Sequence, residues 1–358
     1  MTNHVNSRNN STDLKTLDRP ELEAFAESIG EPRFRGRQLF KWLYEKGATS
    51  FEEMTDLPAG LRERLGEIAE IGTITEVQQQ TAKDKTVKKL YQLPSGRHIE
   101  TVLIPDFEED GKVRRLTVCV SSQVGCAMGC HFCATGLMGF HENLTAGQIF
   151  DQARYMDTLA RERFGRGISN VVYMGMGEPL QNYANVVKST RLITEGLGLA
   201  PKRITVSTVG LARRIRQLAD EDAPFGLAIS LHAPTDAQRS AIMPVNRSEK
   251  TDLVALEGAV KHYHAKTGKR VTYEYCMFDG INDGEADARN LADVARWAPC
   301  KVNLIMYNPV EGVAFSPTSE PRLNRFIRVL VGEGVRVTVR RSRGQDIDAA
   351  CGQLAVQA

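Results

Sequence analysis

The spacing of apolar residues changes character along the chain, and each change predicts a different kind of structure. From residue 18 to residue 72 the spacing is helical: one helix begins at Arg19-Pro20-Glu21 and ends at Gly30, and a second spans residues 37–46 with an apolar face. Residues 51–71 continue as a helix interrupted at Leu57-Pro58. Between residues 73 and 105 the period falls to two, with a turn at residues 94–96, which predicts a small β element.

After residue 116, strand-like runs alternate with amphipathic helical stretches. The predicted strands are 116–120, 168–174, 203–207, 226–231, 270–276, 301–306 and 335–339. The predicted helices are 145–163, 182–195, 211–219, 251–266, 285–297 and 320–332. This alternation favours an α/β fold in which a parallel sheet curls into a partial (β/α) barrel, with an open doubly wound sheet as the alternative.

These changes divide the chain into four segments. Residues 1–17 are polar and rich in Asn and Ser, which predicts a disordered tail. Residues 18–72 form an N-terminal helical module, and residues 73–115 form the small β element or linker. Residues 116–358 form the barrel and end in a loop that contains Cys351.

The composition is ordinary for a globular protein, with 42% apolar and 25% charged residues. We expect no membrane segment, because no apolar run approaches the roughly 18–20 residues that span a bilayer. Seven cysteines without an export signal predict thiols in a reducing cytoplasm, not a disulfide framework. The net charge of +2 does not predict a nucleic-acid partner by itself.

Basic residues nevertheless cluster in two places. Residues 31–46 contain five basic and two acidic side chains, and Lys83, Lys85, Lys88 and Lys89 form a second group. A solvated helix face and a surface that contacts RNA phosphates explain the first cluster equally well.

Three cysteines spaced C-x3-C-x2-C follow the first predicted barrel strand: Cys126, Cys130 and Cys133. Three thiolates in so short a loop can hold three irons of a 4Fe–4S cube and leave the fourth iron open to a ligand. The alternative is a structural zinc site, but zinc needs a fourth ligand, which His131 could supply only awkwardly from within the same loop.

Polar residues also mark the ends of several predicted strands, where a barrel places its chemistry. These strand ends are the segments 175–179, 207–210, 230–234 and 303–309. Each alone could be part of a turn or a helix cap. Together they suit a zwitterionic ligand that carries a ribose.

Of the remaining cysteines, we interpret Cys276 and Cys300 as small buried hydrophobes. Cys119 lies on the first barrel strand. Cys351 follows the basic residues Arg336, Arg340, Arg341 and Arg343, whose charge would lower its pKa and favour the thiolate. Chemistry alone leaves a reactive and a structural Cys351 equally open.

Several segments together resemble the RlmN/Cfr family of radical S-adenosylmethionine (SAM) RNA adenine methyltransferases. They are CVSSQVGCAMGCHFCATG, GMGEPL, SLHAP, NLIMYNP and RGQDIDAACGQL. The C-terminal segment is the specific one, since the three-cysteine spacing marks the whole radical SAM superfamily. The match is closest to the branch that methylates C2 of one adenosine in 23S rRNA and of the adenosine 3′ to the tRNA anticodon.

The resemblance implies a role for each candidate residue. Cys126, Cys130 and Cys133 would hold a 4Fe–4S cluster. SAM, which acts as methyl donor and radical source with two molecules used per turnover, would be bound by Gly177, Glu178, Ser207, Ser230, Leu231, His232 and Asn308. Cys351 would carry the methyl group, Cys119 would form a transient disulfide with it, and Glu100 would accept a proton.

The resemblance also implies 23S rRNA, tRNA and an electron donor such as flavodoxin or ferredoxin as partners of a monomer. Methylation at C8 by the sister branch, a radical-SAM maturase acting on a protein, and a zinc-bound RNA-binding protein remain as alternatives.

Overall fold

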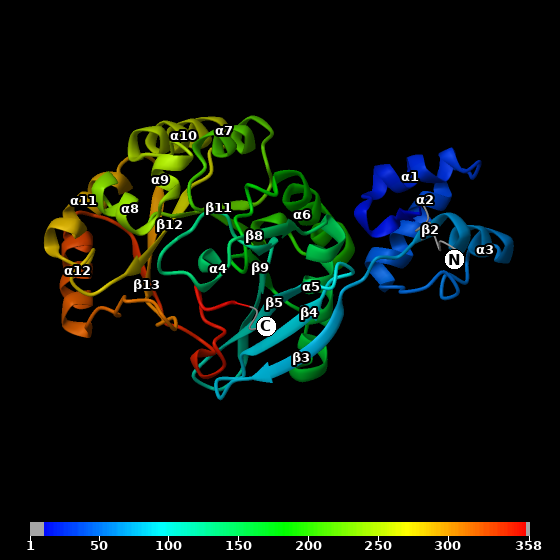
Figure 1. Cartoon of the computed structure of the whole chain (residues 1–358), viewed down its shortest axis with the longest axis horizontal. Helices are drawn as coiled ribbons and strands as arrows, with labels where there is room; N and C mark the ends of the chain where they lie inside the picture. The colour runs from blue at the N-terminus through cyan, green and yellow to red at the C-terminus, as the bar shows by residue number, and fades with distance from the viewer. Residues whose placement is uncertain (1–10, 356–358) are drawn as a thin grey trace, which may run out of the picture.

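The computed structural model describes residues 11–355, and its largest feature is a ten-stranded sheet (Figure 1). Seven strands of this sheet pair in parallel, and each lies beside the strand next to it in that series: β6 (Val113–Val120), β9 (Asn170–Tyr173), β10 (Ile204–Thr208), β11 (Gly226–Ser230), β12 (Val271–Met277), β13 (Cys300–Met306) and β14 (Val337–Arg340). A doubly wound sheet would reverse its strand order part-way, whereas a barrel adds strands in one direction. The order therefore confirms the predicted partial barrel.

Helices connect the parallel strands and cover the outer face of the curved sheet (Figure 1). The six predicted helices are present: α5 (Ala146–Phe164), α6 (Tyr183–Leu197), α7 (Ala212–Asp220), α10 (Leu253–Thr267), α11 (Glu285–Ala295) and α12 (Glu320–Gly332). Two short helices that the periodicity did not predict, α8 (Asp236–Ile242) and α9 (Val245–Ser248), follow β11, and the turns η3 (Pro201–Arg203) and η4 (Gln345–Ile347) complete this part. No helix in the described part of the chain is both long and apolar enough to span a membrane.

The small β element predicted at residues 73–115 is made of strands that join the barrel sheet. Strands β3 (Thr75–Thr81), β4 (Val87–Gln92) and β5 (His98–Phe107) pair antiparallel with one another, and β5 pairs with β6. They therefore extend the barrel sheet instead of forming a linker. This arrangement places Val102 of β5 beside Cys119 of β6.

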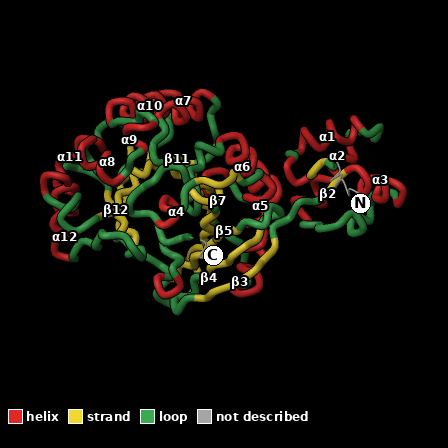
Figure 2. The backbone as a smooth tube through the Cα atoms, in the orientation of Figure 1, coloured by secondary structure: helices red, strands yellow, loops and turns green. Residues whose placement is uncertain are grey.

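The N-terminal module packs at one end of the barrel (Figure 2). It contains α1 (Arg19–Ser28), α2 (Phe34–Phe40), the π-helical turn η2 (Lys41–Lys46) and α3 (Ala59–Ile68). Gly36 is required where α2 crosses α1, because a Cβ there would lie 2.4 Å from the Glu23 backbone. The predicted helix over 51–71 is wrong in its first part, since α3 begins only after Pro58.

The prediction of a disordered tail at residues 1–17 is also wrong for its second half, and residues 1–10 lie outside the described part. Strand β1 (Thr12–Asp13) pairs with β2 (Ala69–Glu70), and η1 (Leu14–Thr16) follows. Leu14 is fully buried, and Lys15 forms a buried ion pair with Asp151 of α5. The polar composition of this segment did not predict its order, because only two residues, Leu14 and Lys15, make the contacts that fix it.

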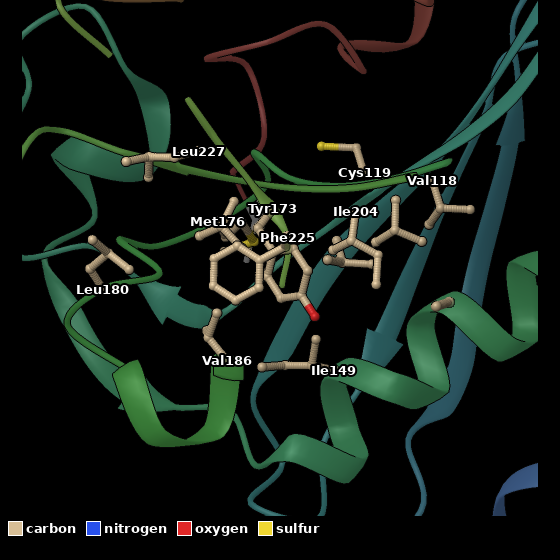
Figure 3. Packing of buried hydrophobic residues seen from close by; sticks show 14 of the residues in the cluster. Val118, Cys119, Ile149, Tyr173, Met176, Leu180, Val186, Ile204, Phe225 and Leu227 are labelled. Atoms are coloured by element: carbon tan, nitrogen blue, oxygen red, sulfur yellow. The ribbon is translucent and has the colours of Figure 1, made fainter. Parts of the chain in front are cut away.

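The first barrel strand has two different faces. On one face, buried side chains such as Ile149 of α5 and Val186 of α6 pack into the core (Figure 3). Figure 3 shows the sulfur of Cys119 pointing away from these two side chains. The thiol of Cys119 is thus presented to the interior of the barrel, where the site lies.

Candidate active site

The three-cysteine loop is held by a small hairpin, β7 (Gln123–Gly125) and β8 (Phe140–Asn143), that brackets the short helix α4 (Ala134–Leu137). Gly125 has a φ of 69°, and a Cβ there would lie 1.8 Å from the Gly139 carbonyl oxygen. The Cys126 N–H donates to that same oxygen at 2.8 Å. The glycines therefore let the hairpin close tightly and fix the start of the loop.

The thiols of Cys126, Cys130 and Cys133 line one cavity, as the spacing predicted. Burial raises the pKa of each of these thiols, and for Cys126 the value is about 12. Such thiols need a bound cation to become thiolates. The loop therefore supplies a donor set that fits a metal group.

That donor set fits an iron–sulfur cluster better than zinc. The backbone N–H of His131 donates to the Ile242 carbonyl oxygen at 3.0 Å. The residue is exposed and does not line the cavity, so its side chain is no fourth ligand there. A cube with a separate iron for each thiolate accepts such an arrangement.

Four of the predicted strand-end residues line the same cavity beside Glu178: Gly177, Ser207, Ser230 and His232. The two carboxyl oxygens of Glu178 accept the N–H groups of Leu180 at 2.9 Å and Val209 at 2.8 Å. Burial raises the pKa of Glu178 to about 7, although these hydrogen bonds favour the carboxylate. The cavity thus offers a carboxyl group and the hydroxyls of Ser207 and Ser230, which lie 3.3 Å apart.

His232 is held as a neutral ring. Its Nδ1 accepts the Cys276 N–H at 3.0 Å, which leaves the proton on Nε2. Burial lowers the pKa of His232 to about 3, with a smaller effect from the charge of Arg239. The ring stands edge-on to Phe132 with centroids 5.0 Å apart, so its orientation is fixed.

Two predicted SAM-binding residues do not line the cavity. Leu231 is fully buried, and its N–H donates to the Glu274 carbonyl oxygen at 3.0 Å. Asn308 lies under the C-terminal segment, where its side-chain amide donates to the Cys351 carbonyl oxygen at 3.3 Å and its side-chain oxygen accepts from Gln345 at 3.0 Å.

The C-terminal segment docks on the three-cysteine loop. The Ala134 N–H donates to the Gly352 carbonyl oxygen at 2.8 Å, and the Thr135 hydroxyl donates to the Leu354 carbonyl oxygen at 2.5 Å. Cys351 therefore lines the same cavity as Cys126, Cys130 and Cys133. The sequence separates these residues by more than 200 positions.

Cys351 lies close enough to Cys119 to affect the pKa of the Cys119 thiol. Burial raises the pKa of Cys119 to about 12, and the next largest cause is Cys351. The expectation that basic residues lower the pKa of Cys351 is wrong in its net direction: burial raises it, and of the four nearby arginines only Arg340 opposes this rise. Cys351 is exposed as a residue, but it also lines the cavity.

Comparison with known proteins establishes the family. The chain is 60% identical over 353 residues to a probable dual-specificity RNA methyltransferase RlmN of Salinibacter ruber, with 98% of this chain and 96% of the relative covered. The chain belongs to the RlmN family. A relative named dual-specificity RNA methyltransferase RlmN from Nitratidesulfovibrio vulgaris is 44% identical over 96% of this chain and 94% of its own length. The chain is accordingly a radical SAM enzyme that methylates RNA.

Two domain families and one crystal structure agree with this assignment. Residues 12–71 match the ribosomal RNA large subunit methyltransferase N-terminal domain, and residues 120–292 match the radical SAM superfamily. The crystal structure of a radical SAM methyltransferase from Sphaerobacter thermophilus superposes with a TM-score of 0.89 at 44% identity, covering 97% of this chain and 100% of that one. Membership in the radical SAM family implies SAM and a 4Fe–4S cluster as cofactors.

Glu100 lies on β5 of this RlmN-family chain, but it faces a different cavity. That second, polar cavity is lined by Glu100, Lys88, Gln78, Gln80 and residues of the C-terminal segment. One Glu100 oxygen pairs with Lys88 at 2.9 Å, while the other is buried without a partner. Burial raises the pKa of Glu100 despite the lysine. The C-terminal segment borders both cavities, since Gly352 and Leu354 line the first and Gln353 and Ala355 line the second.

Sequence reasoning missed two charged residues of this region. Glu274 on β12 is buried, lines the first cavity and accepts the Asn303 side-chain N–H at 2.7 Å. Arg340 lies at the end of β14. Burial lowers the pKa of Arg340, but the nearby Cys351, Glu274 and Cys119 raise it. A carboxylate inside the apolar strand Val271–Met277 was a signal for the first. Arg340 was noted only as one of four basic residues.

Proposed function

We propose that this chain methylates C2 of one adenosine in 23S rRNA and of the adenosine 3′ to the anticodon in tRNA. Two relatives named dual-specificity RNA methyltransferases support both substrates. The observation that carries the proposal is the docking of the C-terminal segment on the three-cysteine loop, which brings Cys351 into the cavity and close to Cys119.

The cavity has residues for both cofactors. Cys126, Cys130 and Cys133 would hold the 4Fe–4S cluster. When bound, the cluster supplies the electron that cleaves SAM to a carbon radical. Glu178 would accept hydrogen bonds from the SAM amino group, and a Cβ at Gly177 would lie 2.5 Å from the Gln123 side chain, so only glycine leaves the backbone in place there.

Ser207 and Ser230 would bind the ribose hydroxyls, and His232 would offer its Nε2 proton to SAM. Leu231 and Asn308 would act through their positions: Leu231 fixes the strand end, and Asn308 holds the peptide of Cys351.

Two cysteines would divide the transfer of the methyl group. C2 of adenine lies between two ring nitrogens and is electron-poor, so it does not attack the methyl group of SAM. Cys351 would first take a methyl group from SAM as a thiolate, a step that Arg340 favours by opposing the rise in its pKa. The methyl carbon on the Cys351 sulfur would then lose a hydrogen atom to the radical derived from SAM and bond to C2. After loss of the C2 proton, Cys119 would attack the Cys351 sulfur, break its bond to that carbon and form a disulfide, and the freed carbon would take up a proton to complete the methyl group.

Glu100 would accept the proton that leaves C2. Burial raises the pKa of Glu100, which makes its carboxylate a stronger base. Because it faces the second cavity, the target adenine would enter from that side, along the polar surface of Gln78, Gln80 and Lys88. We propose that the N-terminal module, residues 18–72, binds folded RNA.

An electron donor such as flavodoxin or ferredoxin, a cytoplasmic location and a monomeric state complete the proposal. Nucleoside mass spectrometry tests the reaction directly. Anaerobically reconstituted protein, supplied with SAM and a reductant, should form 2-methyladenosine in a 23S rRNA fragment and in tRNA. Formation of 8-methyladenosine would assign the chain to the sister chemistry, and modification of protein without change in RNA would favour a maturase.

A further inference from the structure

Arg239 on α8 is a buried cation without an ionic partner. Its side chain is fully buried, and it is the largest such side chain in the described structure. Among residues 11–355, no aspartate or glutamate forms an ion pair with it. Its guanidinium donates instead to three neutral oxygens, the Asn246 side chain and the Thr251 and Val209 carbonyls, and its Nε has no partner.

Such a charge is costly, because a buried ion normally needs a counter-charge as well as hydrogen bonds. The nearest carboxylate in the hydrogen-bond network is Asp236, and Arg239 reaches it only through Asn246, whose side-chain N–H donates to Asp236 at 3.1 Å. Within residues 11–355, no carboxylate touches the guanidinium directly, so an anionic group bound nearby would stabilise it.

The guanidinium binds the carbonyl oxygen of Val209, a residue that lines the cavity of the three cysteines. The His131 N–H, next to Cys130, donates to the carbonyl oxygen of Ile242 at the end of α8. Met243, whose N–H donates to the Arg239 carbonyl oxygen at 2.8 Å, lines the cavity with the cysteines. Burial lowers the pKa of Arg239 to about 10, so enclosure already disfavours the charged form.

We propose that Arg239 is the buried counter-charge of the iron–sulfur cluster and raises its reduction potential. Reduction adds a negative charge to the cluster, and a fixed cation in a region of low dielectric constant stabilises the reduced form. Arg239 also fixes the Val209 peptide, whose N–H holds Glu178. It is a positioning residue, because it acts through its charge and through neighbours and touches no reacting atom.

The inference rests on the proposed cluster, and its test is the midpoint potential of that cluster, measured by anaerobic redox titration with electron paramagnetic resonance of the reduced protein. Arg239→Met keeps the length of the side chain without the charge. It should lower the ratio of reduced to oxidised cluster at a fixed potential by about tenfold, equivalent to a shift of about 59 mV to more negative values for a one-electron couple. Arg239→Lys keeps the charge and should stay near the wild-type potential.

A second variant tests the charge with Arg239 in place. The double substitution Asp236→Asn with Asn246→Asp exchanges a carboxylate and an amide, leaves the net charge unchanged and puts the anion beside the guanidinium. It should shift the potential in the same negative direction as Arg239→Met, and it keeps the test open if that variant does not fold.

Iron content separates the two hypotheses. Wild-type protein that binds no iron after reconstitution would overturn the proposed function. Full iron content with wild-type potentials in Arg239→Met or in the double variant would overturn the inference alone. An equal shift in Arg239→Lys and Arg239→Met would also overturn it, because shape and not charge would then set the potential.

Discussion

Glu178 is a carboxyl group that the protein encloses and yet holds by two backbone N–H groups. Because burial raises its pKa to about 7, it is mostly protonated below that pH and ionised above it. Only the carboxylate can accept hydrogen bonds from a ligand amino group while both N–H groups remain bound. We therefore expect the affinity for SAM to increase as pH rises through about 7.

Between pH 6 and pH 8 the change in affinity should be about tenfold, since only the ionised fraction is competent to bind. Calorimetric titration of reconstituted protein with SAM measures it. Glu178→Gln, which cannot ionise, should bind weakly at every pH. The same pH dependence in both proteins would show that another group is responsible.

Arg340 opposes the rise in the pKa of the Cys351 thiol that burial causes. Replacing it by Met should raise that pKa further and leave less thiolate at pH 8. The rate of Cys351 alkylation by iodoacetamide, followed against pH, should shift to higher pH in Arg340→Met, with Arg336→Met as the control from the same basic run. An unshifted profile in Arg340→Met would show that Arg340 does not affect the pKa of the Cys351 thiol.

Local sequence patterns identified most of the candidate site residues. Their pKa values and their places in the two cavities depend on residues that are distant in the sequence. The spacing of Cys126, Cys130 and Cys133 lies within eight residues, so the sequence displays it directly. The pKa of Cys351 is raised and not lowered as expected, because the thiol is buried. That burial depends on packing against segments far away in the chain. The same packing separates Glu100 from the first cavity, and no motif reports it.

At the scale of elements, the period of apolar residues located the strands and helices that are buried on one face. Strand β3 shows the limit: all seven of its residues are exposed, so it carries no apolar alternation. Hydrogen bonding to β4 makes it a strand. Likewise, η1 is fixed by tertiary contacts of Leu14 and Lys15 and has no helical period of its own.

The ion pair of Lys15 and Asp151 joins η1 to α5 and so ties the N-terminal module to the barrel. Lys15→Met leaves the Asp151 charge buried without a partner, and we expect it to lower the free energy of unfolding by about 3–5 kcal/mol. Denaturant unfolding followed by tryptophan fluorescence measures this loss. Adding Asp151→Leu should restore most of it, because no unpaired charge then remains.

The control for this prediction is the exposed pair of Lys112 and Asp110. Lys112→Met should change the free energy of unfolding by less than about 1 kcal/mol. If Lys15→Met is no more harmful than Lys112→Met, the buried pair does not anchor the module.

At the scale of the whole molecule, the N-terminal module and the barrel site must reach the same RNA. The structure reduces the local excess of basic charge, because Arg33 pairs with Glu23 at 2.6 Å and Arg35 with Glu31 at 3.8 Å. Lys88 and Lys89 of the second basic group are paired as well. Lys41 is exposed, and Arg33 stays exposed although it is paired with Glu23, so both can reach phosphates.

Reversing Arg33, Arg35 and Lys41 to Glu should weaken RNA binding and flatten the dependence of log K on log salt by about one unit for each lost contact. The matched control reverses Arg289, Arg325 and Arg328 on α11 and α12, at the far end of the molecule (Figure 1). Equal losses in both triple variants would indicate a general effect of net charge and no docking surface on the module.

The central claim gives two cysteines different tasks, and the fate of Cys119→Ala tests it most directly. Without the Cys119 thiol, the carbon–sulfur bond to Cys351 cannot be broken by disulfide formation. After reaction with SAM and RNA, Cys119→Ala should therefore accumulate as a covalent protein–RNA adduct, seen on a denaturing gel as a nuclease-sensitive band of raised mass and mapped to Cys351 by mass spectrometry. Cys351→Ala should give no adduct. Normal turnover by Cys119→Ala, or an adduct at a residue other than Cys351, would contradict the account.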